Sequence, residues 1–397
     1  MLLVGIASVP AHAESIRAQQ WHLDAMGAEE IWKLSTGKGV TVAVIDSGVE
    51  KGVPDLQGQV LQGKDFGAGE EAGDTFTDYL NHGTGIAALI AGTGAKGGGN
   101  GSFGLAPGAK ILPVRVPGLA AGESSITESA KEFNRVVPKA ITYAADSGAQ
   151  VINISLATTA GSQELTDAVK YALDKGALVF AGVGNDAEKG NDLMYPAATP
   201  GVVGVGAVDN KAKRIPMSQY GPQVDVVAPG KDMVHACSGG TGLCKSTGSS
   251  DATALASAAA ALLWSKHPDW TNNQVLKVML NTVAGPTDGE KRSNHVGFGA
   301  LRPLRTLKTP GDPGPADVRP IDDLTEIATA TPTPTAGELP SADPAPADSS
   351  ETPAPAPGPV AGEDEGGNTG LWIGLGIGAA VLIGAAVAVP VLRSRRG

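Results

Sequence analysis

Short apolar runs alternate with helix-forming stretches from about Gly39 to Leu304, and this alternation restricts the fold more than any other feature. Five runs are predicted to be buried strands: Val40–Ile45, Lys110–Val116, Val151–Leu156, Ala177–Ala181 and Val202–Val208. Five stretches have the periodicity of helices: His82–Ala91, Asn134–Asp146, Gln163–Lys175, Ala252–Ser265 and Asn272–Thr282. Strands that alternate with helices predict an α/β fold, with a mostly parallel sheet and helices on both of its faces. Active residues of such folds gather at the carboxyl ends of the strands.

Three short runs supply a carboxylate, an imidazole and a hydroxyl to this predicted domain. The runs are Val44–Gly48, Asn81–Gly85 and Gly248–Ala252. They contain Asp46 at the end of a predicted strand, and His82 and Ser250 at the starts of two predicted helices. A serine hydroxyl is a weak nucleophile until a histidine ring accepts its proton, and that ring needs a carboxylate to hold its tautomer. These three residues are therefore candidates for a catalytic triad.

Each candidate also has an ordinary structural interpretation. Asp46 could be a strand-end carboxylate, and His82 could simply be the first residue of a helix. Ser250 could be a helix N-cap, a position that favours serine. Asn185, in a Gly-Asn pair after another predicted strand, could be a turn residue. The joint occurrence of all three triad residue types in the order Asp, His, Ser favours the catalytic interpretation.

The chain resembles the subtilase family of serine proteases over about two thirds of its length. Subtilisins place their triad in the order Asp, His, Ser, whereas unrelated triad folds use other orders. Four segments are similar to family motifs: Lys38–Val49, His82–Gly85 followed by Ala91-Gly92, Gly184-Asn185, and Val224–Gly230. The resemblance implies a subtilisin-like fold and a serine endopeptidase that cleaves protein or peptide substrates.

The resemblance also implies roles for individual residues. Ser250 is expected to attack the scissile carbonyl, His82 to shuttle the proton and Asp46 to orient His82. The side-chain amide of Asn185 is expected to hold the oxyanion together with the backbone N–H of Ser250. The expected substrate-binding residues are Ser155, Leu156, Ala157, Gly182 and Gly184.

Several positions beside the expected site depart from the family pattern, and three of them bear on the site. Asp251 places an acidic side chain directly after Ser250. Pointed at His82, it would raise the pKa of that ring, but we expect it to face outward. Ala157 stands where the family has glycine, which implies a narrower first specificity pocket. Ala254 stands where the family has proline, which implies a less rigid helix start.

Both ends of the chain carry features of an exported, membrane-anchored protein. Residues 1–13 form a short apolar stretch that ends in the A-x-A site Ala11-His12-Ala13, which indicates a signal peptide. Because the usual basic segment before it is missing, the signal is either atypical or begins upstream. Residues 371–392 carry no charge and precede three arginines. This pattern predicts a single transmembrane helix, with residues 393–397 as a cytoplasmic basic tail.

Two further segments flank the predicted peptidase domain of residues 39–308. Residues 309–370 contain 13 of the 28 prolines, and twelve acidic residues against one basic residue, Arg319. This composition predicts a disordered linker rich in proline, alanine and acidic residues. Residues 14–38 are too short for a cleavable prodomain, so we expect a permanent extension anchored by Trp21, Leu23 and Ile31. The predicted domain is close to neutral, which gives no support for a nucleic-acid partner.

Cys237 and Cys244 are the only cysteines, seven residues apart and shortly before Ser250. Outside the cytoplasm, a lone close pair favours a disulfide. The spacing excludes a C-x-x-C redox motif, and two cysteines alone make a poor metal site. Subtilases often bind calcium, but no compact cluster of carboxylates identifies a site here, so no cofactor is assigned.

The flanking segments, together with Gln20–Leu23, narrow the resemblance to the mycosins. These membrane-anchored proteases are associated with the type VII secretion systems of actinobacteria. The resemblance implies a cell-membrane protein with an extracellular catalytic domain, a cytoplasmic C-terminus and a secretion complex as a partner. A structural function is the alternative: the domain and its membrane helix could stabilise that complex, with proteolysis secondary. An intact triad is compatible with both functions.

Overall fold

The computed structural model describes residues 15–67, 72–117, 126–240 and 242–322. These residues fall within one compact unit. The predicted signal peptide, residues 323–370 of the predicted linker, the predicted transmembrane helix and the basic tail lie outside the described residues. Within the ranges described, no helix combines the length and the apolar character needed to cross a membrane.

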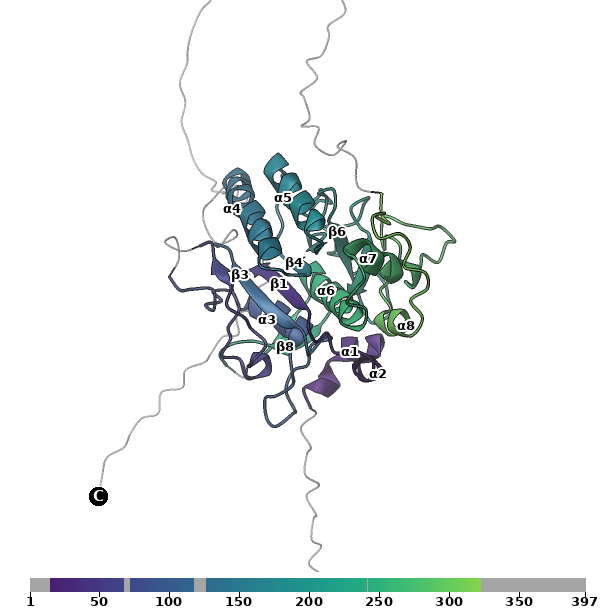
Figure 1. The fold of residues 1–397 in the computed structure, drawn as a ribbon. Helices are drawn as coiled ribbons and strands as arrows, with labels where there is room; N and C mark the ends of the chain where they lie inside the picture. The colour runs from purple at the N-terminus through teal and green to yellow at the C-terminus, as the bar shows by residue number, and fades with distance from the viewer. Residues whose placement is uncertain (1–14, 68–71, 118–125, 241, 323–397) are drawn as a thin grey trace, which may run out of the picture. The chain divides into compact units, whose positions relative to one another are not determined.

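Seven parallel strands form the central sheet (Figure 1). In sheet order they are β2 (Lys64–Asp65), β3 (Lys110–Arg115), β1 (Thr41–Asp46), β4 (Val151–Ile154), β5 (Leu178–Gly182), β6 (Val203–Val208) and β7 (Val226–Pro229). The register sets Val42 opposite Val151 and Ile45 opposite Val114. Apart from the short β2, the strands are buried along nearly their whole length. Parallel strands covered on both faces have continuous apolar runs, which is the pattern that the sequence shows.

Alternate side chains of the strands enter two separate cores. The helices that cover the sheet are α3 (His82–Ala91), α4 (Ile126–Asp146), α5 (Gln163–Asp174), α6 (Ser249–Lys266) and α7 (Asn272–Asn281). Val42 and Val44 pack in one core with α3, α6 and α7, whereas Ala43 and Ile45 pack in the other with α4 and α5. Figure 1 shows α4 and α5 side by side, away from α3 and α6. The predicted α/β architecture, with helices on both faces of the sheet, is confirmed.

The elements that periodicity did not predict are short. They are the 3-10 helices η1 (Arg17–Gln19) and η2 (Pro54–Leu56), α1 (Trp21–Met26), α2 (Ala28–Trp32), α8 (Pro303–Lys308), β2, β7, and the antiparallel hairpin of β8 (Met233–Ala236) and β9 (Leu243–Ser246). Helix α4 also begins at Ile126, ahead of its predicted start at Asn134. Its first turns carry exposed charged side chains such as Glu128 and Lys131, which give little apolar pattern.

Helix α6 runs through the core. Every residue from Ser249 to Trp264 is buried except Ser250. The helix is built mainly of alanine and leucine on all sides, as expected for a helix enclosed by protein. Its first turn therefore holds Ser250 where a rigid, buried element reaches the surface.

Residues 15–38 lie against the domain as an integral layer. The side chains of Leu23 and Ile31 are fully buried in the core that contains α3 and α6. The buried Gln20 amide donates to a carbonyl oxygen in β8 (3.1 Å), and Trp21 Nε1 donates to a backbone carbonyl just before β8 (3.0 Å). The extension is thus joined to the hairpin by hydrogen bonds as well as by apolar packing.

The folded region continues past the predicted start of the linker at Thr309. Residues 309–322 lie along α7, where Asn281 Nδ2 donates to the carbonyl of Asp312 (2.9 Å) and Gln274 Nε2 donates to another carbonyl (3.0 Å). Ile321 is buried. The composition of this stretch indicated disorder, but side chains of α7 bind its backbone carbonyls and hold it in place.

Candidate active site

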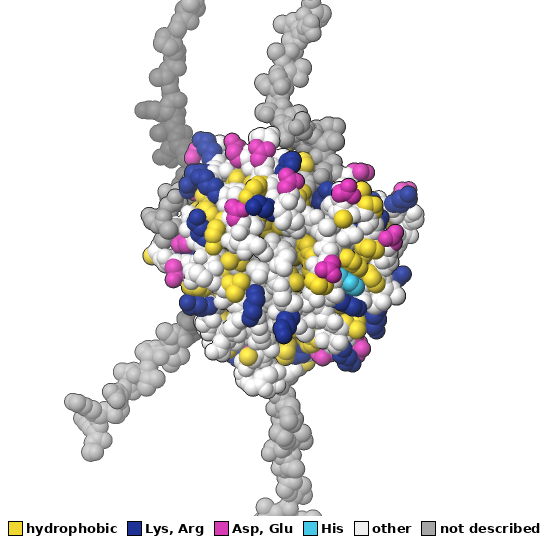
Figure 2. All heavy atoms as spheres, in the orientation of Figure 1, with side chains coloured by type: hydrophobic (Ala, Val, Ile, Leu, Met, Phe, Trp, Pro, Cys, Tyr) yellow, Lys and Arg dark blue, Asp and Glu magenta, His cyan; other side chains and the backbone are white. Residues whose placement is uncertain are grey.

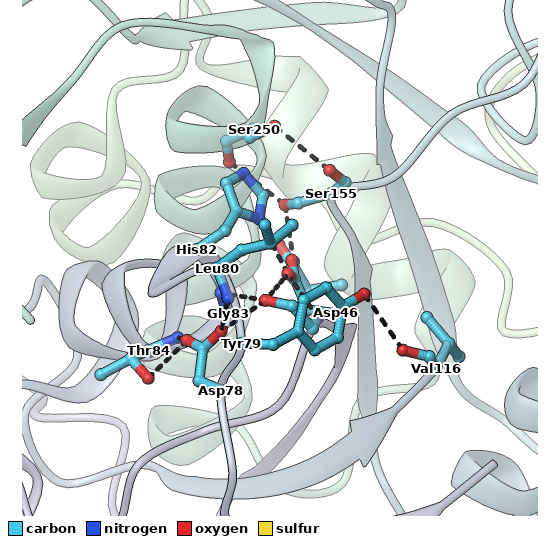
Figure 3. Close-up of polar contacts among 12 residues, drawn as sticks. Asp46, Asp78, Tyr79, Leu80, His82, Gly83, Thr84, Val116, Ser155 and Ser250 are labelled. Atoms are coloured by element: carbon cyan, nitrogen blue, oxygen red, sulfur yellow. Dashed lines mark hydrogen bonds and ion pairs between the residues drawn. The ribbon is translucent and has the colours of Figure 1, made fainter. Parts of the chain in front are cut away.

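The last residue of β1 and the first residue of α3 are in direct contact (Figure 3). Nδ1 of His82 lies 2.8 Å from Oδ1 of Asp46. The Asp46 side chain is fully buried, while His82 leaves 34% of its side chain exposed. Gly83 permits this approach, because a Cβ there would lie 2.2 Å from the carbonyl oxygen of Gly48. A buried carboxylate thus holds one edge of a ring that remains open to the surface.

A second carboxylate, Asp78, holds the start of α3. Its Oδ2 accepts from both the backbone N–H (2.7 Å) and the hydroxyl (2.6 Å) of Thr84. Its Oδ1 accepts from the hydroxyl of Ser47 (2.7 Å), and that hydroxyl accepts from the N–H of Gly83 (3.1 Å). Asp78 was not predicted from the sequence. An acidic residue just before a predicted helix is a typical capping signal and could have revealed it.

Ser250 lies in the first turn of α6, and its hydroxyl donates to the carbonyl oxygen of Ser155 (3.2 Å). Figure 3 shows the ring of His82 between the side chains of Ser250 and Asp46. In proteins without substrate, catalytic hydrogen bonds are often long or redirected and tighten when substrate binds. The three predicted triad residues therefore meet in one place, from β1, α3 and α6.

Asn185 is placed next to this helix start. Its Oδ1 accepts from the backbone N–H of Ser249 (2.8 Å). Its Nδ2 borders Gly248, where a Cβ would come within 3.0 Å of that nitrogen. The amide is thereby oriented by a backbone N–H of α6. Such an amide beside a helix N-terminus is the kind of donor set that stabilises a developing negative charge.

Of the expected substrate-binding residues, those after β4 lie beside Ser250. Besides accepting from the Ser250 hydroxyl, Ser155 donates through its own hydroxyl to the carbonyl of Ser250 (3.4 Å). Leu156 is partly exposed and Ala157 is exposed. This segment is thus an accessible edge next to the candidate nucleophile.

Gly182 and Gly184 lie behind the helix start rather than beside an open surface. Both are buried. A Cβ on Gly182 would lie 2.8 Å from Oγ of Ser249, and the N–H of Gly184 donates to that same oxygen (3.2 Å). Gly184 also has a positive φ of 104°, which favours glycine. These contacts support the position of α6, and a direct role in substrate binding stays a prediction.

Asp251 was predicted to face outward, but it does not. It is buried, and its Oδ1 is hydrogen-bonded to the hydroxyl of Ser246 (2.6 Å). The prediction is wrong because the first turn of α6 is enclosed by other elements except at Ser250. Burial lowers the pKa of His82, yet the charge and hydrogen bond of Asp46, and then the charges of Asp251 and Asp78, raise that pKa to about 9.

Cys237 and Cys244 form the predicted disulfide, with an S–S distance of 2.04 Å. The bond closes the turn of the β8–β9 hairpin. Ser238, the next residue, donates through its N–H (2.9 Å) and its hydroxyl to Oδ1 of Asn81, which immediately precedes His82. The hairpin is therefore attached to the start of α3.

Charged side chains of both signs lie on the surface of the molecule (Figure 2). Figure 2 shows positive and negative side chains interspersed on one face of the molecule, with no large area of a single sign. Among the residues that the structure describes, no group of three or more His, Cys, Asp or Glu side chains could hold a metal ion.

Comparison with known proteins agrees with the sequence resemblance. The profile of the subtilase family (peptidase S8) matches residues 37–299. A thermophilic serine proteinase of Bacillus sp. (strain AK1) is 38% identical over 209 residues, which are 52% of this chain and 48% of that protein. Thermitase of Thermoactinomyces vulgaris is 35% identical over 214 residues, 54% of this chain and 71% of thermitase. This chain thus spans about half the length of the first relative.

Solved structures similar to this chain include proteases of type VII secretion systems. The MycP3 protease from a type VII (ESX-3) secretion system has a TM-score of 0.62 at 31% identity, covering 72% of this chain and 87% of that one. MycP1 from Mycobacterium smegmatis has a TM-score of 0.64 at 27% identity, covering 78% and 89%. A chain of the periplasmic assembly from the ESX-5 inner membrane complex has a TM-score of 0.66 at 26% identity, covering 80% and 90%. These matches confirm the resemblance to subtilases and, among them, to the mycosins.

Proposed function

The chain belongs to the subtilase family of serine peptidases, and we propose that it is a membrane-anchored extracellular serine endopeptidase associated with a type VII secretion system. One observation carries the catalytic part of this proposal. The Asp46 carboxylate binds Nδ1 of His82 at 2.8 Å, on the ring that faces Ser250 (Figure 3). A carboxylate, imidazole and hydroxyl in this arrangement are the machinery of acyl transfer through a serine nucleophile.

The proposed reaction follows from the roles of these groups. Ser250 attacks the scissile carbonyl while His82 takes the hydroxyl proton, and Asp46 stabilises the imidazolium that forms. The amide of Asn185 and the backbone N–H of Ser250 donate to the oxyanion of the tetrahedral intermediate. His82 then gives its proton to the leaving amine, and water hydrolyses the acyl-enzyme by the same steps. The proposed reaction includes no cofactor.

Two substitutions test this chemistry. Ser250→Ala is expected to abolish both peptide hydrolysis and labelling by a fluorophosphonate. Asn185→Ala is expected to lower kcat by roughly 10²–10³ with little change in KM, because the amide acts mainly in the transition state; this magnitude was measured in a subtilisin. Hydrolysis that survives undiminished in the Ser250→Ala protein would overturn the assignment of the nucleophile.

Three features support the proposed location. The uncharged residues 371–392 are long enough to span a bilayer. The arginines that follow favour a cytoplasmic C-terminus. The A-x-A site near the N-terminus is typical of exported proteins. Protease added to intact protoplasts should digest the catalytic domain and leave a small membrane-bound fragment that contains the C-terminus. Complete protection of the chain would show the opposite orientation.

A structural function is the second candidate, and the similarity to a chain of the ESX-5 inner membrane assembly favours it. The scaffold hypothesis predicts that Ser250→Ala protein restores secretion in cells that lack the wild-type chain. If only active protein restores secretion, cleavage is the essential act. We favour the scaffold result, because a membrane helix and long linker add nothing to peptide hydrolysis but would tether the domain to a complex.

A further inference from the structure

Three polar side chains adjoin the site and have no part in the proposed mechanism: His235 of β8, Ser246 of β9 and Asp251 of α6. His235 and Asp251 are only 5% and 3% exposed. The Ser246 hydroxyl lies between them, 2.6 Å from Oδ1 of Asp251 and 3.0 Å from Nε2 of His235. Nδ1 of His235 lies 3.0 Å from the carbonyl oxygen of Ala236. The three side chains thus form one continuous hydrogen-bonded chain.

The directions of these hydrogen bonds determine how many protons the chain holds. The carbonyl of Ala236 can only accept, so Nδ1 of His235 carries a proton. Ser246 has one proton, which it gives either to Asp251 or to Nε2 of His235. If Ser246 donates to Asp251, Nε2 of His235 must carry a proton in order to donate to Ser246. If Ser246 donates to Nε2 instead, Asp251 must carry a proton in order to donate to Ser246. Either way, one extra proton is shared between Asp251 and His235, and the cluster is neutral overall.

Burial favours one of these two placements while His82 is neutral. Burial raises the pKa of Asp251, opposed by His235, Ser246 and His82. Burial also lowers the pKa of His235, opposed mainly by Asp251. Both effects oppose separated charges and favour the placement of the shared proton on Asp251. A positive charge on His82 would reverse the preference, because it attracts an ionised Asp251 and repels a proton on that carboxyl.

The cluster is packed against the helix that carries His82. A Cβ on Gly85 would lie 2.4 Å from the ring of His235, so that ring rests on the first turn of α3. Asp251 directly follows Ser250 and acts electrostatically on His82. The other titratable or charged groups that face these residues are Asp46 of β1, Asp78 before α3, and His22 of α1 with Arg17 beside it.

We propose that Asp251, Ser246 and His235 form a proton relay that responds to His82, and that Asp251 is thereby a positioning residue for the proton of the general base. When His82 becomes protonated, the O–H bond of Asp251 breaks and its proton passes to Oγ of Ser246. The original proton of Ser246 passes to Nε2 of His235. No proton leaves the cluster, but its negative charge is now on Asp251, where it favours the imidazolium. This inference deepens the proposed peptidase function and rests on it.

Substitutions at the two ends of the relay should shift the titration of His82 in the same direction, because the relay needs both groups. Asp251→Asn removes a carboxylate whose charge favours the imidazolium. We expect the acid limb of kcat/KM to move down by about 1 pH unit. His235→Gln cannot take up the proton, so burial keeps Asp251 protonated and neutral when His82 becomes charged. We expect the acid limb to move down in this variant as well, by about 1 pH unit.

A double variant and a surface variant serve as controls. In the Asp251→Asn background, His235→Gln should leave the acid limb unchanged, because no carboxylate remains to respond. Asp174→Asn removes one negative charge at an exposed position of α5 and should also leave it unchanged. Shifts of Asp251→Asn and His235→Gln that add up in the double variant would overturn the relay, because independent losses of charge or packing are additive.

Nuclear magnetic resonance separates the relay from the proposed activity. In protein that carries only Ser250→Ala, the Nε2 resonance of His235 should move in step with the titration of His82. This measurement needs no substitution in the relay, so misfolding of a variant cannot obscure it. A His235 resonance that ignores the His82 titration would contradict the relay, whatever the enzyme hydrolyses. Coupled titration in a wild-type protein without hydrolytic activity would instead contradict the peptidase function.

Discussion

The proton affinity of His82 is the residue-scale property with the clearest thermodynamic consequence. Its pKa rises from 6.5 to about 9, against the opposing effect of burial, because Asp46, Asp251 and Asp78 all favour the imidazolium. Between these two values the folded protein binds more protons than the unfolded chain. The resulting stabilisation is complete below pH 6.5 and is lost as the pH rises through about 9.

We therefore expect the free energy of unfolding of the Ser250→Ala protein to fall between pH 6.5 and 9 more steeply than that of a Ser250→Ala, His82→Gln double variant. Urea unfolding at several pH values measures both. The comparison cancels the other titrating groups, which the two proteins share. Parallel curves for the two proteins would show that His82 has an ordinary pKa.

The sequence predicted the residues of this site whose neighbours form recognisable motifs. Asp46, His82, Ser250 and Asn185 each follow or begin an element that apolar patterning reveals. Asp251 was noticed but given the wrong orientation. Periodicity showed a helix there, but only the tertiary structure shows that its first turn is enclosed by other elements.

At the scale of elements, the β8–β9 hairpin connects parts of the site that are far apart in sequence. It contacts the start of α3 through Ser238, and the start of α6 through Ser246. The apolar pattern of the sequence could not predict the hairpin, because each strand has only four residues and β9 has no buried residue. The cysteine pair marked its turn, but the strands on either side carry no independent signal.

The disulfide should contribute modestly to the free energy of unfolding and should also support catalysis. A disulfide between residues seven apart lowers the conformational entropy of the unfolded chain, which stabilises the folded protein by about 2–3 kcal/mol. We expect a Cys237→Ser, Cys244→Ser variant to lose about that much free energy of unfolding in urea. We also expect kcat to fall at temperatures where the protein remains folded, because the hairpin holds Asn81 beside His82. Unchanged kcat with reduced stability would limit the disulfide to a structural role.

At the scale of the whole molecule, the N-terminal extension is part of the folded core rather than a detachable segment. Leu23 is fully buried, while Leu34 in the same extension is 39% exposed. Leu23→Ala should lower the free energy of unfolding by about 2–5 kcal/mol, as deletion of buried leucine side chains does. Leu34→Ala is the matched control and should change it far less, because solvent already covers much of that side chain. Urea unfolding measures both variants. Equal, small effects would mean that the extension is only loosely attached and that the domain folds without it.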